Sequence, residues 1–326
     1  MKAIQLEEGE LHVRDVAEPQ PGADEARVRL RASGVCHSDL HLARGDWMGV
    51  PRSMSLGHEG IGVVEALGPG AERFVTVGDR VILGLGGMGG GYWCGACDYC
   101  LSGRPRLCAQ ARPLMGTFAE QLCVWAPALV PVPDALGDEE APLACGGLTA
   151  FSAVRKLVAH GIAPGRTIAV IGAAGGLGHY AVQIAQAFGY RVVGVDVGEE
   201  RLEFVRALGA EHAVSAALVF AARLAGFDLG LQMLRRGGLF VAVGIPASSE
   251  GNLQLHPWQL FLTDPTIIYS AVGTVQEMRE LVDLAAAGKV KTHVSRVGSL
   301  SDVPAIFDEL EAGKYLGRAV ITDLTR

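Results

Sequence analysis

Six of the seven cysteines fall into two sequence patterns of different kinds. Four lie close together in CGACDYCLSGRPRLC, at Cys94, Cys97, Cys100 and Cys108. Two lie far apart, Cys36 in GVCHSDLH and Cys145 in APLACGGLTA, with His58 in GHEG between them. Four thiolates close a tetrahedral zinc site, whereas a Cys, His, Cys set leaves one zinc position open for water or a substrate. Together the two sets predict one structural and one catalytic zinc ion.

The compact set has the spacing Cys-x2-Cys-x2-Cys-x7-Cys. This spacing lets three thiolates on a tight loop bind one ion, and the fourth thiolate completes its tetrahedral coordination. Because this site has no vacant position, we expect it to hold a loop that has little core of its own. An iron–sulfur cluster and a redox dithiol are the alternatives. In a chain of this kind, Cys-x-x-Cys indicates metal binding or redox chemistry rather than a framework of disulfides. We therefore expect the protein to be located in a reducing cytoplasm.

The neighbours of the scattered set support a catalytic role. His58 is flanked by glycine and followed by Glu59. Cys36 precedes a dense polar cluster that is unlike ordinary core, made of His37, Ser38, Asp39 and His41. The remaining cysteine, Cys123 in EQLCVW, is expected to pack in a strand.

The composition of the chain limits the kinds of partner that it is expected to bind. The length of 326 residues suggests two domains, and 49% hydrophobic with 19% charged residues is typical of a packed soluble protein. With a net charge of −7 and no basic cluster, a nucleic-acid partner is not expected. The charged N-terminus does not resemble a signal peptide, and no apolar run approaches the roughly 18 residues of a membrane span.

Periodicity predicts a change of architecture near residue 147. The first part is expected to be β-rich, with strands within 26–35, 59–68 and 79–83. The later part predicts a doubly wound α/β domain with a parallel sheet. Its expected strands are 167–172, 191–197, 238–244 and 266–273, and its expected helices are 175–189, 198–210, 227–238 and 275–288.

One stretch conflicts with this layout. Residues 211–214 and 217–222 both have the pattern of parallel strands, with only Ser215 and Ala216 between them. Adjacent parallel strands need a crossover of about a dozen residues. Three explanations stay open: a missing crossover helix, a truncated sheet, or a loop absent from the sequence.

A glycine-rich turn, GAAGGLG, follows a predicted strand and opens a predicted helix, with glycines at Gly172, Gly175, Gly176 and Gly178. Such a turn lets the backbone approach a pyrophosphate at a helix N-terminus. Asp196, about 20 positions later, would accept hydrogen bonds from ribose hydroxyls and repel a 2′-phosphate, which favours NAD. Arg201 lies close enough to keep NADP open. A turn that only packs the helix on the strand is the alternative.

In order along the chain, GVCHSDLH, GHEG, the four-cysteine loop, APLACGGLT, GAAGGLG, VDVG and GRAVI resemble the zinc-dependent medium-chain alcohol dehydrogenases. GAAGGLG and GDW at 45–47 are most similar to yeast-type and bacterial tetrameric members. The resemblance implies a GroES-like catalytic domain (1–146 and 281–326) and a Rossmann-type dinucleotide-binding domain (147–280). If the chain truly lacks the residues of a crossover, the second domain lacks a crossover helix near 214–217. The resemblance further implies hydride transfer between an alcohol and NAD, giving an aldehyde or ketone, in a homo-oligomer, either a tetramer or a dimer.

The resemblance also implies residue roles. Cys36, His58 and Cys145 would bind the catalytic zinc, while Asp39 would orient His58 and Glu59 would lie behind the metal and ligate it transiently. Ser38 would take the alcohol proton and His41 would pass it to solvent. The implied cofactor and substrate contacts are His37 and Arg318 at the pyrophosphate, Leu177 within the glycine turn, Thr149 against the nicotinamide, and Trp47 in the substrate pocket.

Two segments depart from the family pattern next to the expected substrate cleft. The stretch between Cys108 and Gly116 is short, and GLGGMGGGYW before Cys94 is long and rich in glycine. Trp47 with its Leu and Met neighbours favours a small apolar alcohol. A zinc dehydrogenase acting on a polyol, amino alcohol or aromatic alcohol is the second hypothesis, and a non-catalytic relative of the fold is the third.

Overall fold

The computed structural model describes residues 1–47, 49–83, 90–197 and 214–326. The chain divides into two compact units. Unit 1 comprises residues 1–45, 49–148 and 273–326, and unit 2 comprises residues 46–48 and 149–272. The domain limits given above from the sequence remain a prediction.

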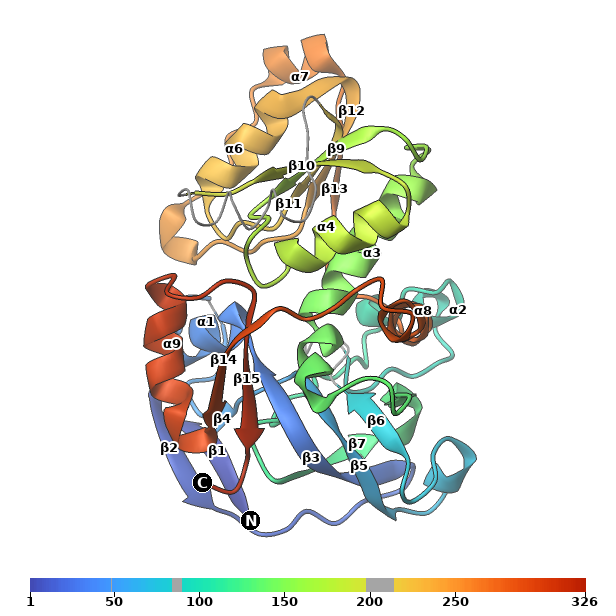
Figure 1. The fold of residues 1–326 in the computed structure, drawn as a ribbon, viewed down its shortest axis with the longest axis vertical. Coiled ribbons are helices and arrows are strands. Elements are labelled where there is room, and N and C mark those ends of the chain that lie inside the picture. Colours follow the sequence, from blue (N-terminus) through green and yellow to red (C-terminus); the bar gives the residue numbers. More distant parts are fainter. Residues whose placement is uncertain (48, 84–89, 198–213) are drawn as a thin grey trace. The chain divides into compact units, whose positions relative to one another are not determined.

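Unit 1 is β-rich, as the sequence predicts (Figure 1). Its strands are β1 (Lys2–Glu7), β2 (Glu10–Asp15), β3 (Glu25–Val35), β4 (Met54–Ser55), β5 (Gly60–Leu67), β6 (Arg80–Leu83), β7 (Gln121–Trp125), β8 (Val130–Pro131), β14 (Val294–Ser299) and β15 (Arg318–Asp323). Its helices are α1 (His37–Arg44), α2 (Asp98–Leu101), α8 (Val275–Ala286) and α9 (Val303–Glu311), with 3₁₀ turns η1 (Ala71–Arg73), η2 (Pro105–Leu107), η3 (Ala126–Ala128), η4 (Asp138–Ala144) and η6 (Leu300–Asp302).

Strand β3 is the centre of the larger sheet of unit 1. The order in this sheet is β14-β15-β3-β5-β6-β8, and β7 also pairs with β3. Along β3, Ala26, Val28 and Leu30 are buried, whereas Arg27 is partly buried and Arg29 is exposed, which is the alternation expected of a sheet with one packed face. Since β5 and β15 lie on either side of β3, residues that follow or precede these strands meet near Val35.

Unit 2 is built on a parallel sheet with the order β10-β9-β11-β12-β13. Its strands are β9 (Thr167–Ile171), β10 (Arg191–Val195), β11 (Val214–Val219), β12 (Leu234–Ala242) and β13 (Thr266–Tyr269), and its helices are α4 (Gly178–Ala187), α6 (Leu224–Met233) and α7 (Pro257–Thr263), with η5 (Ser248–Glu250). Helix α3 (Gly146–Ala159) begins in unit 1 and continues into unit 2. In Figure 1, α4 and α6 lie on opposite sides of the sheet, which is the predicted doubly wound arrangement.

Strands β11 and β12 differ from the sequence prediction. Ser215 and Ala216, expected to join two strands, lie inside the single strand β11. This strand is central because it pairs with both β9 and β12. The predicted helix at 227–238 ends instead at Met233, because Leu234 takes an extended conformation and pairs with Val214. The predicted helix 198–210 and most of the predicted strand 211–214 lie outside the described residues.

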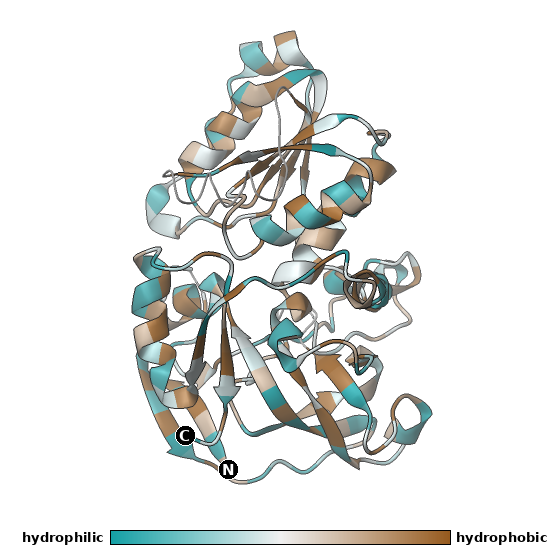
Figure 2. Cartoon of the chain, in the orientation of Figure 1, coloured by the Kyte–Doolittle hydropathy of each residue, from teal (hydrophilic) through white to brown (hydrophobic). Residues whose placement is uncertain are grey.

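The hydropathy pattern follows the layers of each unit. Residues of β9, β11 and β12 form an apolar cluster in unit 2, on which Phe227 of α6 packs against Phe240. Figure 2 shows these inner strands mostly in brown, while α8 and α9 carry both colours on their surfaces. None of the helices formed by the described residues is long and apolar enough to cross a bilayer.

Candidate functional site

The scattered cysteines and His58 converge in unit 1. Cys36 lies between β3 and α1, His58 and Glu59 immediately precede β5, and Cys145 follows η4. Because β3 and β5 pair with Ser33 opposite Gly60, the first two segments are held side by side. One donor atom from each of the four residues lies within 4.8 Å of all the others, and all four residues are buried.

Asp39 fixes the orientation of His58. Its Oδ1 atom lies 3.0 Å from Nδ1 of His58 and accepts a hydrogen bond from the backbone N–H of Gly57 at 3.1 Å. Its Oδ2 atom accepts from the backbone N–H of Cys36 at 3.2 Å. With Nδ1 engaged, Nε2 of His58 is left for a metal ion. Although burial opposes the charged imidazole, the Asp39 carboxylate raises the pKa of His58 well above its ordinary value.

A hydrogen bond joins the two cysteine side chains of this set. The hydrogen bond from Cys145, together with His58, holds the pKa of Cys36 well below its ordinary value. The same hydrogen bond, together with burial, raises the pKa of Cys145. A cation at this position would remove the remaining proton, since the thiolate is the form that binds metals. The donor set therefore fits zinc.

Glu59 is completely buried beside the metal ligands. Its Oε1 atom accepts a hydrogen bond from the backbone N–H of Gly146 at 3.3 Å, and its Oε2 atom forms an ion pair with Arg318. Burial raises the pKa of Glu59 to about 7, and the Arg318 charge opposes this rise. Arg318 Nη2 also donates to the carbonyl of Val35 at 2.9 Å. Arg318, predicted at the cofactor pyrophosphate, thus contacts the carboxylate behind the metal ligands.

Residues absent from the sequence prediction hold Glu59 in place. The Oγ1 atom of Thr117 accepts from the Glu59 backbone N–H at 3.2 Å, and the Ser33 hydroxyl donates to the Glu59 carbonyl at 3.0 Å. The two hydroxyls lie 2.7 Å apart. Gly34 leaves room for the carboxylate, because a Cβ atom there would lie 2.1 Å from Oε2 of Glu59. No motif in the sequence marks these three residues.

The four clustered cysteines also form a set whose sulfur atoms lie within 4.8 Å of one another. The backbone N–H groups of Ala96 and Cys97 donate to Cys94 Sγ at 3.5 and 3.3 Å, and they lower the pKa of Cys94 to about 6. Burial and the neighbouring Cys97 raise the pKa of Cys100 to about 12. Backbone donors aimed at a thiolate cluster favour a bound cation. All seven cysteines of the chain are free thiols.

The predicted proton-relay residues lie on α1, directly after Cys36. His37 is exposed, whereas Ser38 and His41 are partly buried. The rings of His37 and His41 are 6.2 Å apart. Helix α1 and its N-cap residue Cys36 therefore place a candidate metal ligand, the orienting carboxylate of Asp39 and the proton-relay candidates within one short segment.

The glycine turn joins β9 to α4 in unit 2. Gly172 has a φ of +82°, and a Cβ atom on Gly178 would lie 2.0 Å from the carbonyl oxygen of Gly172. Leu177 caps the N-terminus of α4, and Gly176 precedes it in the turn. Asp196, just after β10, accepts from the backbone N–H of Ala174 at 2.8 Å, so its carboxylate lies against the turn.

The remaining predicted contacts fall in three places. Thr149 is buried in α3 of unit 2, and Trp47 also belongs to unit 2 by its contacts. Arg201 lies outside the described residues. The roles of Thr149, Trp47 and Arg201 stay predictions.

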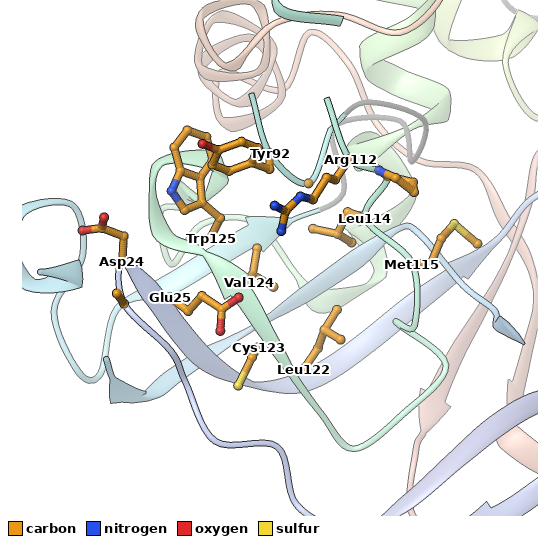
Figure 3. Close-up of a pocket in the computed structure, with 13 residues that line it drawn as sticks. Asp24, Glu25, Tyr92, Arg112, Leu114, Met115, Leu122, Cys123, Val124 and Trp125 are labelled. Carbon is orange, nitrogen blue, oxygen red and sulfur yellow. The ribbon is translucent and has the colours of Figure 1, made fainter. Parts of the chain in front are cut away.

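A separate cavity of about 310 Å³ lies in unit 1 between the start of β3, β7 and the segments around Tyr92 and Arg112 (Figure 3). Arg112 lies over the ring of Tyr92, 5.0 Å from its centre, and Tyr92 packs against Trp125. Burial raises the pKa of Cys123, which lines this cavity, to about 11. Both segments that depart from the family pattern contribute to its wall, and no predicted site residue within the described part of the chain lines it.

Comparisons with known proteins agree with this geometry. Residues 22–134 match the family described as alcohol dehydrogenase GroES-like domain, and residues 176–287 match the family described as zinc-binding dehydrogenase. An alcohol dehydrogenase of Geobacillus stearothermophilus is 38% identical over 98% of this chain and 99% of its own.

Solved structures are similar over the whole chain. The alcohol dehydrogenase of the archaeon Aeropyrum pernix superposes with a TM-score of 0.88 at 31% identity, covering 99% of this chain and 100% of that one. Acetophenone reductase from Geotrichum candidum, solved in complex with NAD, superposes with a TM-score of 0.86 at 30% identity, covering 99% and 96%. The predicted fold class, a GroES-like domain with a Rossmann-type domain, is confirmed.

Proposed function

Because the chain belongs to the zinc-dependent medium-chain alcohol dehydrogenase family, we propose that it transfers hydride reversibly between a small primary or secondary alcohol and NAD, with two zinc ions per chain. This proposal rests on the observation that the buried side chains of Cys36, His58 and Cys145 lie close together. Asp39 is hydrogen-bonded to Nδ1 of the His58 imidazole, the ring nitrogen that would face away from the metal. Such a set leaves one zinc position open for the alcohol.

The proposed mechanism divides the work among residues of this chain. When bound, zinc supplies Lewis acidity that lowers the pKa of an alcohol hydroxyl. Ser38 accepts the hydroxyl proton and His41 passes it to solvent, since an imidazole accepts protons near neutral pH. A bound nicotinamide ring would accept the hydride from the alcohol carbon, which would give the aldehyde or ketone, the reduced cofactor and one proton. In this proposal Thr149 would pack against the bound nicotinamide, and Trp47 would line an apolar substrate pocket from which water is excluded.

The preference for NAD rests on Asp196. Its position just after β10, against the glycine turn, suits a carboxylate that accepts hydrogen bonds from the ribose hydroxyls of NAD. The 2′-phosphate of NADP would be repelled there by the negative charge of the carboxylate. The Geotrichum relative, crystallised with NAD, supports a nicotinamide dinucleotide. Replacing Asp196 with Ala should reduce the ratio of kcat/KM for NAD to that for NADP, and an unchanged ratio would remove Asp196 from the ribose site.

Metal analysis tests the two zinc sites separately. We expect two zinc ions per wild-type chain and one in Cys36→Ser, which should lose turnover but keep its fold by circular dichroism. The matched control is Cys123→Ser, which removes the cysteine outside both sets and should keep both ions. Retention of two ions by Cys36→Ser would contradict the assignment of this ligand.

The substrate class is tested by NADH formation from a panel of alcohols, with and without a zinc chelator. Chelator-sensitive activity highest with small apolar alcohols supports the proposal. Activity confined to polyols, amino alcohols or aromatic alcohols would replace the substrate assignment, and no activity in a zinc-loaded sample would refute it.

We further propose a homo-oligomer that assembles through β13, an edge strand among the described residues of unit 2. Trp258 and Phe261 of the neighbouring α7 are 65% and 76% exposed, and Tyr269 of β13 is 61% exposed. Large apolar side chains gathered at a sheet edge are typical of subunit interfaces. The molar mass in sedimentation should be a multiple of 34.2 kDa and should fall in Phe261→Asp.

The free thiols support a cytoplasmic location. Six of the seven cysteines act as metal ligands in this proposal, and an oxidising compartment would compete for them by forming disulfides.

A further inference from the structure

Two buried hydroxyl groups form a closed ring of hydrogen bonds with the backbone of Glu59. The N–H of Glu59 donates to Oγ1 of Thr117 at 3.2 Å, and Oγ of Ser33 donates to the carbonyl oxygen of Glu59 at 3.0 Å. The two hydroxyl oxygens lie 2.7 Å apart. Ser33, Glu59 and Thr117 are all 0% exposed, so the ring is shielded from water.

The hydrogens of this ring can be arranged in one way. Because the Glu59 carbonyl can only accept, the Ser33 hydroxyl uses its single hydrogen there. The bond between the two hydroxyls then takes its hydrogen from Thr117, whose oxygen accepts from the Glu59 N–H. Removal of either hydroxyl therefore costs the other hydroxyl a partner as well, and the bonds of the ring depend on one another.

Thr117 is bonded to the residues on both sides of the metal ligand His58. Its backbone N–H donates to the carbonyl of Gly57 at 3.1 Å, and its side chain accepts from the N–H of Glu59. The packing is close, because a Cβ atom on Gly57 would lie 2.6 Å from Oγ1 of Thr117. The backbone that carries His58 is therefore held at two points by one residue.

Ser33 extends this support to the first metal ligand. It lies in β3, three residues before Cys36, and it pairs with Gly60 of β5. The ring thus joins the segment that carries Cys36 to the segment that carries His58. Thr117, 84 positions from Ser33, completes this link from a third segment of the chain.

We propose that Thr117 is a positioning residue for the catalytic metal, because its hydroxyl, through the ring with Ser33, holds the segments of Cys36 and His58 at the spacing that one ion requires. This role rests on the proposed function. It complements that of Asp39, which bonds the imidazole of His58 and the N–H of Gly57. Asp39 orients the ligand side chain, whereas Thr117 fixes the backbone that carries it.

The test compares Thr117→Val, which removes the hydroxyl and keeps the branched shape, with Thr117→Ser, which keeps the hydroxyl. The catalytic zinc is the ion that is absent from Cys36→Ser, and its affinity is measured by competition with a chelator. We expect about tenfold weaker binding in Thr117→Val, the lower end of the effect of residues that support metal ligands, and wild-type binding in Thr117→Ser. A role in stability alone would lower the melting temperature of Thr117→Val but leave the zinc affinity of its folded form unchanged.

A second measurement tests the ring itself. Ser33→Ala should also weaken binding of the catalytic zinc. Because each hydroxyl loses a partner when the other is removed, Ser33→Ala combined with Thr117→Val should lose less affinity than the product of the two single fold-changes. A combined loss equal to that product would show that the hydroxyls act independently and would overturn the ring.

The matched control is Thr167→Val, which removes the hydroxyl of a buried threonine of β9 in unit 2 and should keep the wild-type affinity for both ions. Equal affinity for the catalytic zinc in Thr117→Val and the wild type would overturn the proposal. If Thr117→Val does not fold, an unchanged affinity in Ser33→Ala overturns it instead. A wild type that lacks the catalytic ion altogether would refute the proposed function, which is distinct from failure of the Thr117 role in a wild type that binds two ions.

Discussion

Asp39 shows how much of the site depends on one carboxylate. It accepts from the backbone of Cys36 and of Gly57 and bonds Nδ1 of His58, so it joins two ligand segments and selects the imidazole tautomer. Its side chain is fully buried. A charge there stabilises both the position and the basicity of His58.

Asp39→Asn should therefore weaken binding of the catalytic zinc. The amide keeps the shape of the carboxylate but loses its charge, and we expect about 10–100-fold lower affinity, measured by competition with a chelator. The control is Asp15→Asn, which changes an exposed carboxylate paired with Lys2 at 2.7 Å. Equal zinc affinity in wild type and Asp39→Asn would mean that geometry alone orients His58.

The sequence predicts metal ligands better than their supports. Spacing alone indicates the compact four-cysteine set, because coordination geometry restricts which residues can share an ion. Cys36, His58 and Cys145 are far apart in the sequence, and their prediction depends on their polar and glycine neighbours and on the family resemblance. Ser33 and Thr117 could not be predicted, since they are 84 positions apart and meet only through pairing within the sheet. The contact of Arg318 with Glu59 joins residues 259 positions apart and depends on β15 lying beside β3.

At the scale of elements, the turn between β9 and α4 depends on close approach of its own backbone. The N–H of Gly175 donates to the carbonyl of Gly172 at 3.1 Å, and Gly178 packs on the same carbonyl. A side chain on Gly178 would push α4 away from β9 and tilt the N–H groups that face a phosphate.

We expect Gly178→Ala to reduce stability by about 1–3 kcal/mol and to weaken NADH binding at least tenfold. Gly175→Ala is the graded control, because its Cβ atom would lie 3.2 Å from the same oxygen rather than 2.0 Å. Urea unfolding and NADH titration measure the two effects. A larger loss of affinity in Gly175→Ala would contradict this order.

Element boundaries are where the sequence prediction failed. The pattern of residues 227–238 is that of a helix, yet Leu234 belongs to β12 because Val214 offers it a strand partner. Likewise, Ser215 and Ala216 resemble a connection but continue β11 between two neighbouring strands. Both outcomes depend on pairing between segments distant in sequence, which local propensity does not contain.

Another element-scale contact predicts a dependence on pH. Glu140 of η4 accepts from the backbone N–H of Thr292 at 3.1 Å and from its hydroxyl, and this links the segment before Cys145 to the one before β14. Burial raises the pKa of Glu140. The folded state then keeps its proton at pH values where the unfolded state has lost it, so stability falls as pH rises above the ordinary value of 4.5.

Glu140→Gln should remove this contribution to the fall in stability. The free energy of unfolding, measured in urea at a series of pH values from 4.5 upward, tests this directly. The exposed Glu72→Gln is the control and should keep the wild-type profile. The same slope in Glu140→Gln and wild type would show that Glu140 is ionised in both folded and unfolded chains.

At the scale of the whole molecule, the metal and the dinucleotide are each expected to stabilise a different unit. The metal ligands come from unit 1 and the glycine turn from unit 2. Because zinc joins distant segments that the unfolded chain does not hold together, its binding energy is also folding energy. A dinucleotide that binds only the folded state stabilises it in the same way.

NADH at a hundred times its Kd should stabilise the protein by about 2.7 kcal/mol, and chelation of zinc should lower the melting temperature. Both effects are measured by thermal unfolding of the wild type, and Asp196→Ala should show a smaller NADH shift but an equal chelator shift. A melting temperature indifferent to NADH would contradict a dinucleotide site.

The ion pair of Glu59 with Arg318 also sets an order of events during synthesis. A ribosome that adds about 5–20 residues per second needs tens of seconds to deliver Arg318 after Glu59. Throughout that interval the nascent chain holds Cys36, His58 and, later, Cys145, but not the guanidinium that offsets the carboxylate beside them. The ion pair exists only once β15 has been translated, so the segments that carry Cys36, His58 and Cys145 reach their mature charge balance at the very end of synthesis.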